Sequence, residues 1–172
     1  MQGSGDGGTM WSRGNCWLFC LEWLHGVLKK AGNQRKHLPE HLRVGLEGED
    51  AAYFYLRRKG YIVVARRWGI ADLRGDLDLI AWKEELLCIV EVKTRTARDA
   101  YSAESMVDEE KRTHLRRLAR AYLRRLRGEE APPVRFDILS VYLLPGQKPQ
   151  FEHFENAFGW SARESGRWND RW

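Results

Sequence analysis

Two acidic residues and a lysine stand at the open end of two neighbouring apolar segments. Asp78 lies in the segment 76–82, and Glu91 and Lys93 close the segment 86–93. Both segments are rich in leucine, isoleucine and valine, which predicts two buried strands. Charges at the end of such a hairpin are costly unless they are paired or used. The three side chains are therefore candidates for a functional site.

The turn between the two segments predicts how their residues pair. A tight polar turn at positions 84–85 pairs residues whose numbers sum to 169, so Asp78 faces Glu91. By the same rule Asp76 faces Lys93. Because side chains alternate along a strand, Asp76 and Asp78 share one face. Directly opposed residues have Cβ atoms roughly 5 Å apart, so the hairpin brings its acids close together.

Carboxylates this close predict a site for a divalent metal ion, because they repel each other unless a cation lies between them. Mg²⁺, or Mn²⁺ in its place, binds one or two carboxylates together with a substrate phosphate. We expect Asp78 and Glu91 to hold the ion with help from the Val92 carbonyl. Lys93 would then orient or activate the attacking water. The alternative is an ordinary cross-strand ion pair, in which Lys93 neutralises Asp78 or Asp76.

A third acid is expected on the inner face of the preceding helix. Residues 45–59 have helical periodicity, and Gly60 is a typical C-terminal stop. Glu49 falls on the apolar face of this helix with Ala52 and Leu56. Taken alone, Glu49 is a residue at the boundary of the core. Beside the strand residues, it becomes a candidate to support a metal ion or a water.

A second helix, expected from Asp108 to Arg127, is strongly basic, with eight basic and three acidic residues. Four of its basic residues are expected to contact nucleic-acid phosphates: Lys111, Arg112, Arg116 and Arg120. The alternative is a solvated amphipathic face, which charge runs usually are. No base-reading motif is visible, so recognition of nucleic-acid structure is favoured over recognition of sequence.

Composition and segment order predict one α/β domain with an extension at each end. The 172 residues are 43% hydrophobic with a net charge of +5, which suits one core and polyanionic partners. The domain is expected over 41–158, with a possible short edge strand at 150–154. Residues 1–40 are expected to be an N-terminal extension with a Gly-rich start, an apolar helix and a polar linker. Residues 159–172 are expected to be a flexible tail.

Several weaker signals leave alternatives open. The odd number of cysteines does not resemble a disulfide framework and favours a reducing cytoplasm. Within the apolar helix expected near residues 10–30, the apolar stretch from Cys16 to Leu28 is too short for a membrane span. That helix could recruit a protein partner, and tryptophans near both ends, Trp160 among them, could bind a partner or a membrane surface or pack on the domain. Asp137 could pair with an arginine or lie near the site.

Five short motifs occur in order along the chain. They are G-x-x-G-E at 45–49, G-D-L-D-L-I-A at 75–81, E-V-K at 91–93, R-F-D at 135–137 and N-A-F at 156–158. Together with the helix from Asp108, they resemble the YraN-like family of the PD-(D/E)xK superfamily. Its members are proposed endonucleases that are similar to archaeal Holliday-junction resolvases. The resemblance covers most of the expected domain.

The resemblance implies a restriction-endonuclease-like core, with a mixed central sheet flanked by helices in the order αβββαβ. It implies Mg²⁺- or Mn²⁺-dependent hydrolysis of phosphodiester bonds in DNA, branched DNA included, and a homodimer is possible. The residues that match the catalytic positions are Asp78, Glu91 and Lys93, and Glu49 matches a helix glutamate of the resolvases. Asp76 departs from the family, which usually has Glu there. Two alternative functions are an inactive nucleic-acid-binding module and an interaction protein that uses its N-terminal helix.

Overall fold

The computed structural model describes residues 38–98, 107–126 and 131–161 of the chain. The chain divides between Arg43 and Val44, and the fold below is that of the second unit, Val44–Trp172. The expected N-terminal helix and most of the C-terminal tail lie outside the described residues. Within these residues, no helix combines the length and the apolar character needed to cross a lipid bilayer.

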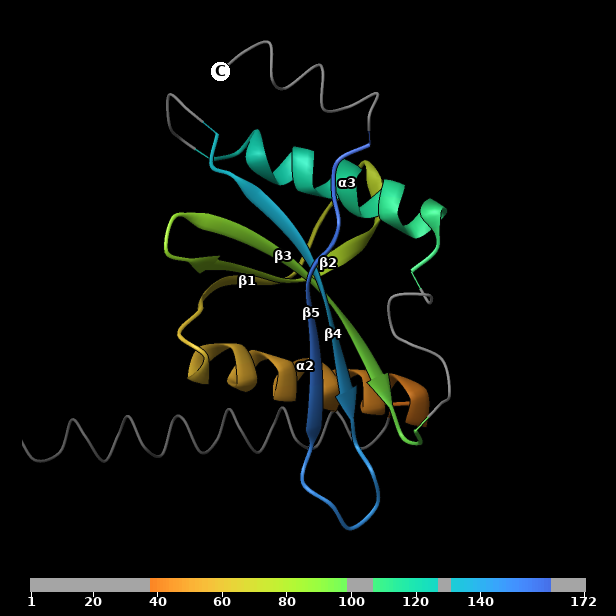
Figure 1. Cartoon of the computed structure of the whole chain (residues 1–172). Helices are drawn as coiled ribbons and strands as arrows, with labels where there is room; N and C mark the ends of the chain where they lie inside the picture. Colours follow the sequence, from red (N-terminus) through yellow and green to blue (C-terminus); the bar gives the residue numbers. More distant parts are fainter. Residues whose placement is uncertain (1–37, 99–106, 127–130, 162–172) are drawn as a thin grey trace, which may run out of the picture. The chain divides into compact units, whose positions relative to one another are not determined.

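Seven elements make up an α/β fold, as the sequence predicted (Figure 1). They are α2 (Glu40–Arg58), β1 (Ile62–Ile70), β2 (Leu73–Lys83), β3 (Leu86–Arg95), α3 (Glu109–Leu123), β4 (Val134–Tyr142) and β5 (Gln150–Phe158). The order αβββαβ was therefore one strand short. The expected short edge segment at 150–154 is a nine-residue strand.

The five strands form one mixed sheet in the order β1-β2-β3-β4-β5. All neighbours are antiparallel except β3 and β4, which are parallel. Parallel neighbours need a crossover connection, and α3 lies in the chain between these two strands. The expected mixed central sheet, flanked by helices, is confirmed.

The core has two layers, one on each face of the sheet, and Figure 1 shows α2 and α3 on opposite faces. On one face, Leu115 of α3 packs in a cluster with Ile89 of β3. On the other face, Leu56 of α2 packs in a cluster with Val90 of β3. We call these the α3 cluster and the α2 cluster. Neighbouring residues of β3 enter different clusters because side chains alternate along a strand.

Two of the sheet's ladders are interrupted near the sheet edges. The pairing of β1 with β2 shifts between Val63 and Ala65 and again between Trp68 and Ile70. The pairing of β4 with β5 shifts between Phe136 and Ile138 of β4. Two non-glycine residues have left-handed backbone near these shifts: φ is 49° at Arg67 and 54° at Asn156.

Helix α2 comes very close to β3 at Gly48. The helix begins at Glu40, five residues before the expected start at Gly45, so Gly45 lies inside the helix. A Cβ atom built on Gly48 would lie 1.8 Å from Oγ1 and 2.7 Å from Cβ of Thr94. Only a glycine lets the backbone come this close to β3. The contact brings the following residue, Glu49, to the end of β3 that carries Lys93.

We expect Gly48→Ala to destabilise the protein by about 1–3 kcal/mol, the usual cost of overpacking a close contact. The matched control is Gly45→Ala on the same helix, because a Cβ at Gly45 meets nothing within 4 Å. The control should gain up to about 1 kcal/mol from helix propensity. Urea unfolding of both variants measures the difference. Equal stabilities would mean that α2 does not contact β3 at Gly48.

Candidate functional site

The hairpin of β2 and β3 has the predicted register, but its ladder ends before the acidic residues. Five pairs, from Lys83↔Leu86 to Leu79↔Val90, follow the predicted sum. The next predicted pairs were Asp78 with Glu91 and Asp76 with Lys93. These residues are not ladder partners in the structure, so this part of the predicted pairing is wrong. Instead, the Val92 N–H donates a hydrogen bond to Asp78 Oδ2 over 2.7 Å. A carboxylate of β2 thus takes the place of a backbone partner for β3.

The side chains of β2 do not alternate regularly around Asp78. Leu77 packs in the α3 cluster with Ile80, whereas Leu79 packs in the α2 cluster. Residues two apart in a regular strand face the same side, so the alternation is interrupted here. The prediction that Asp76 and Asp78 share one face rested on an alternation that β2 does not keep. The interruption lies where the ladder of β2 with β3 ends and the charged residues begin.

Glu91 is the most buried acid of the candidate site. Its side chain is 5% exposed, and its Oε1 atom lies 2.9 Å from Lys93 Nζ and 3.0 Å from Lys111 Nζ. Its Oε2 atom is buried and has no hydrogen-bond partner among the described residues. Lys93 therefore pairs with Glu91 on its own strand, and α3 supplies a second ammonium. The expected alternative, in which Lys93 pairs with Asp78 or Asp76, is not the arrangement found.

The pKa of the Asp78 carboxyl is raised to about 7. Burial is the largest cause, and the charge of Glu91 adds to it. The hydrogen bond from Val92 and the charge of Lys111 act in the opposite direction. Burial and a neighbouring carboxylate both disfavour the ionised form. The site thus holds a carboxyl that ionises near neutral pH.

Glu49 lies at the same end of the sheet, next to Arg67. The Arg67 Nε atom is 3.2 Å from Glu49 Oε2, in an ion pair without hydrogen-bond geometry. Burial raises the pKa of Glu49, and the charge of Glu49 in turn raises the pKa of Asp78. The predicted inward orientation is confirmed, since the Glu49 side chain is 13% exposed. Arg67 also lies 3.9 Å from Asp76 Oδ2, and the sequence analysis did not identify it.

The groups around Asp78 fit a divalent cation. Both carboxylates are partly or wholly buried, and Glu91 Oε2 lacks a partner within the described part of the chain. The N–H and C=O of one strand residue point to the same side, so the Val92 carbonyl faces Asp78. No group of three or more His, Cys, Asp or Glu side chains in the described ranges could hold a metal ion. Glu49 is therefore not a third ligand here, and water and phosphate would complete the set, as Mg²⁺ allows.

Three of the four α3 residues predicted to bind phosphate contact the C-terminal segment at residues 158–160 instead. They are Arg112, Arg116 and Arg120. Arg116 is 5% exposed, and its Nε–H donates a hydrogen bond to the Gly159 carbonyl over 2.8 Å. Arg112 and Arg116 lie over the Phe158 ring, and Arg120 lies over the Trp160 ring. Arg116 cannot present its guanidinium to a ligand from this position, which corrects its predicted role. Trp160 packs on the domain, one of the two alternatives left open above.

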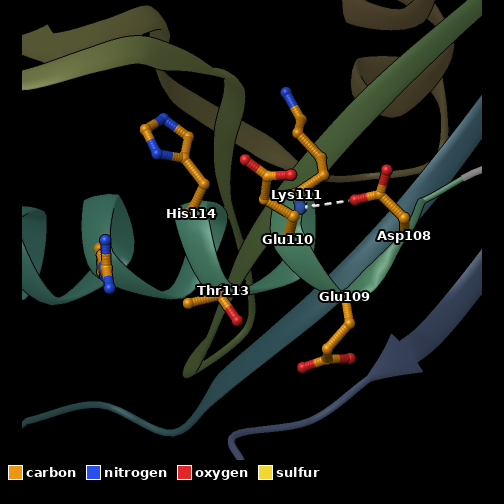
Figure 2. Close-up of a pocket in the computed structure, with 7 residues that line it drawn as sticks. Asp108, Glu109, Glu110, Lys111, Thr113 and His114 are labelled. Atoms are coloured by element: carbon orange, nitrogen blue, oxygen red, sulfur yellow. Dashed lines mark hydrogen bonds between the residues drawn. The ribbon is translucent and has the colours of Figure 1, made fainter.

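A pocket of about 660 Å³ opens beside the first two turns of α3 (Figure 2). Its basic side chains are Lys111, His114 and Arg117, and its acidic ones are Asp108, Glu109 and Glu110. Lys111 is the one predicted site residue among them, and His114 and Arg117 were missed. Their spacing of three residues along a helix was the available signal.

Asp137 is buried in an ion-pair network away from the lysines. Both its oxygens accept hydrogen bonds from Arg135 over 2.8 Å. It also interacts with His153 and with the Asn156 N–H, at 3.1 and 2.9 Å. Of the two readings given above, the arginine pair is confirmed.

Comparisons with known proteins match this chain to one family. The model described as "Uncharacterised protein family UPF0102" matches residues 48–141. A UPF0102 protein of Koribacter versatilis is 48% identical over 120 residues, which cover 70% of this chain and 82% of that protein. Relatives from Solibacter usitatus and Symbiobacterium thermophilum are 43% and 40% identical, covering 77% and 67% of this chain and 98% and 96% of their own lengths. The matched region includes Asp78, Glu91, Lys93 and α3.

Proposed function

We propose, from the premise that this chain belongs to the uncharacterised protein family UPF0102, that it is a metal-dependent endonuclease that hydrolyses phosphodiester bonds in DNA. The observation that carries the proposal is the pair of Asp78 and Glu91 where β2 leaves β3. The pKa of Asp78 is raised to about 7 there, and two lysines compensate Glu91. Strongly shifted pKa values cluster at functional sites.

In this proposal, each residue of the site has a separate role at the phosphate. Asp78, Glu91 and the Val92 carbonyl would hold Mg²⁺ or Mn²⁺, which supplies positive charge to the phosphate oxygens and lowers the pKa of a bound water. Lys93, already beside Glu91, orients the attacking water and stabilises charge that develops on the phosphate. Glu49 acts through its effect on Asp78. The absence of a base-reading motif favours selectivity for DNA structure over sequence.

The test combines metal binding with cleavage. Mn²⁺ should bind the wild-type protein, and Asp78→Ala should lose this binding. The wild-type protein should nick branched or single-stranded DNA with Mg²⁺ or Mn²⁺, and Asp78→Ala should abolish nicking. Cleavage that survives in Asp78→Ala or in EDTA would overturn the assignment. The control is Arg124→Gln, an exposed change at the far end of α3.

A second candidate is a binding module that does not cleave. It is favoured by the two ammonium groups on Glu91 Oε1, which already compensate this carboxylate. This reading expects salt-sensitive DNA binding without turnover, and metal-dependent cleavage of any substrate would exclude it. The third expectation, recruitment of a partner by the N-terminal helix, concerns residues outside the described ranges.

A further inference from the structure

The pocket beside α3 is joined to the acid pair by two contacts. Lys111, which lines the pocket, reaches Glu91 Oε1 over 3.0 Å. His114, which also lines it, lies next to Gly75, where a Cβ atom would be 3.1 Å from the His114 Nε2 atom. Gly75 has φ of 76° and stands three residues before Asp78 on β2. Two side chains that line the pocket therefore also contact β2 and β3, the two strands of the candidate site.

Most of the acidic groups of the pocket are already engaged. Asp108 caps α3 by accepting a hydrogen bond from the Lys111 N–H over 2.7 Å. Glu109 Oε1 accepts a hydrogen bond from Arg116 over 2.6 Å. In Figure 2, Glu109 projects from the side of α3 opposite to Lys111 and His114. Glu110 is the remaining acid of the pocket, and it lines the pocket with the three basic side chains.

The three basic side chains form a row that starts at the acid pair. Lys111, His114 and Arg117 follow one another at intervals of three residues. At 1.5 Å of rise per residue, six residues of helix cover roughly 9 Å. Residues three apart on a helix have Cβ atoms roughly 5–6 Å apart, so these side chains can reach neighbouring phosphates of one DNA strand. Its far end is open, since Arg117 is exposed.

We propose that Lys111, His114 and Arg117 bind successive phosphates of the DNA strand next to the bond that is cleaved. This replaces the flank of Arg112, Arg116 and Arg120, which holds the C-terminal segment. Lys111 has two partners in turn: Glu91 in the free protein, and a phosphate when a divalent cation offsets the charge of Glu91. The inference rests on the proposed function, because it takes the acid pair as the place of cleavage.

The experiment measures DNA affinity against salt concentration. The probes are a labelled duplex and its single strand, each in EDTA and in Ca²⁺. One phosphate contact contributes about 0.9 to the slope of log affinity against log salt for duplex DNA, and about 0.7 for single strands. Arg117→Gln should lower the slope by about one contact in both buffers. Lys111→Gln should do so in Ca²⁺ alone, because Glu91 holds this lysine in EDTA.

The matched control is Arg124→Gln, which removes one charge from the same helix outside the pocket and should leave the slope near that of the wild type. If the wild-type protein binds neither DNA, the proposed function itself fails. If the wild type binds but Arg117→Gln behaves like Arg124→Gln, only the phosphate row is overturned. If Lys111→Gln has the same effect in both buffers, the exchange of Lys111 between Glu91 and phosphate is overturned.

Discussion

Replacing Asp78 by asparagine is expected to make the metal-free protein more stable at pH 8 and to abolish cleavage. The asparagine oxygen can still accept the hydrogen bond from the Val92 N–H. The substitution removes a buried negative charge that faces Glu91, which is one cause of the raised pKa of Asp78. A residue that only orients a metal ligand already contributes about 10–100-fold to metal affinity. We expect at least that loss of Mn²⁺ affinity.

The stability difference between the two proteins should depend on pH. The pKa of Asp78 is raised from 3.8 to about 7 by folding, so the folded state holds this proton more tightly than the unfolded state. The corresponding stability is present below pH 4 and is lost as the pH rises through 7. One pKa unit is worth about 1.4 kcal/mol, so a shift of about three units gives the variant an advantage of up to about 4 kcal/mol at pH 8.

Urea unfolding at pH 4.5, 6 and 8, without metal, measures this difference. The advantage of the variant should grow between the first and the last pH, because asparagine does not titrate. Addition of Mn²⁺ at pH 8 should raise the stability of the wild type alone, since a ligand of the folded state stabilises it. A variant that is less stable than the wild type at pH 8 would mean that Asp78 is a structural partner.

Removing both lysines from Glu91 is expected to cost much more stability than the two single changes combined. In Lys93→Met the apolar stem remains, and Lys111 still pairs with Glu91 Oε1. In Lys111→Met, Lys93 does so. Each single variant should therefore lose about 1 kcal/mol. The double variant leaves Glu91 buried without a cation, and breaking a buried ion pair costs about 3–5 kcal/mol.

A double-mutant cycle of unfolding free energies measures the coupling between the lysines. Cleavage by Lys93→Met separates chemistry from stability: lost turnover with a nearly unchanged melting temperature would place the ammonium in the reaction. A Lys93→Met variant that melts as low as the double variant would contradict a shared role for Lys111. In that case Lys93 mainly holds the hairpin together.

The local parts of the site followed from the sequence because short-range geometry governs them. A two-residue turn sets the pairing of β2 with β3, and Glu84 has the left-handed backbone, at φ 55°, that favours such a turn. Asp108 is the helix cap, as its side chain and position suggested. Glu49 faces inward because helical periodicity put it there. The end of the ladder before Asp78 could not be predicted, because regular alternation gives no sign of where two strands stop pairing.

The long-range parts could not be predicted from local patterns. By local pattern, the arginines of α3 indicate a solvated or phosphate-binding flank. In the structure, three of them lie over the rings of Phe158 and Trp160, which are distant in the sequence. The possible edge strand at 150–154 continues to Phe158 in β5, through a second half that includes the exposed Glu155 and Asn156. Pairing with β4 stabilises this half regardless of its composition. The endonuclease activity and its metal remain predictions.

The interrupted ladders at β1 and β5 bear on whether a strand of another molecule can pair with the edges of the sheet. These are the outermost of the described strands, and a straight edge strand invites a strand from another molecule to add to it. The two shifts in β1, with the charged Arg66 and left-handed Arg67 between them, break the row of backbone groups that such a strand would need. On β5, the left-handed backbone of Asn156 breaks the row of backbone groups in the same way, beside the shift in the pairing with β4. The exposed Ile62 can therefore sit on an edge that is a poor template for aggregation.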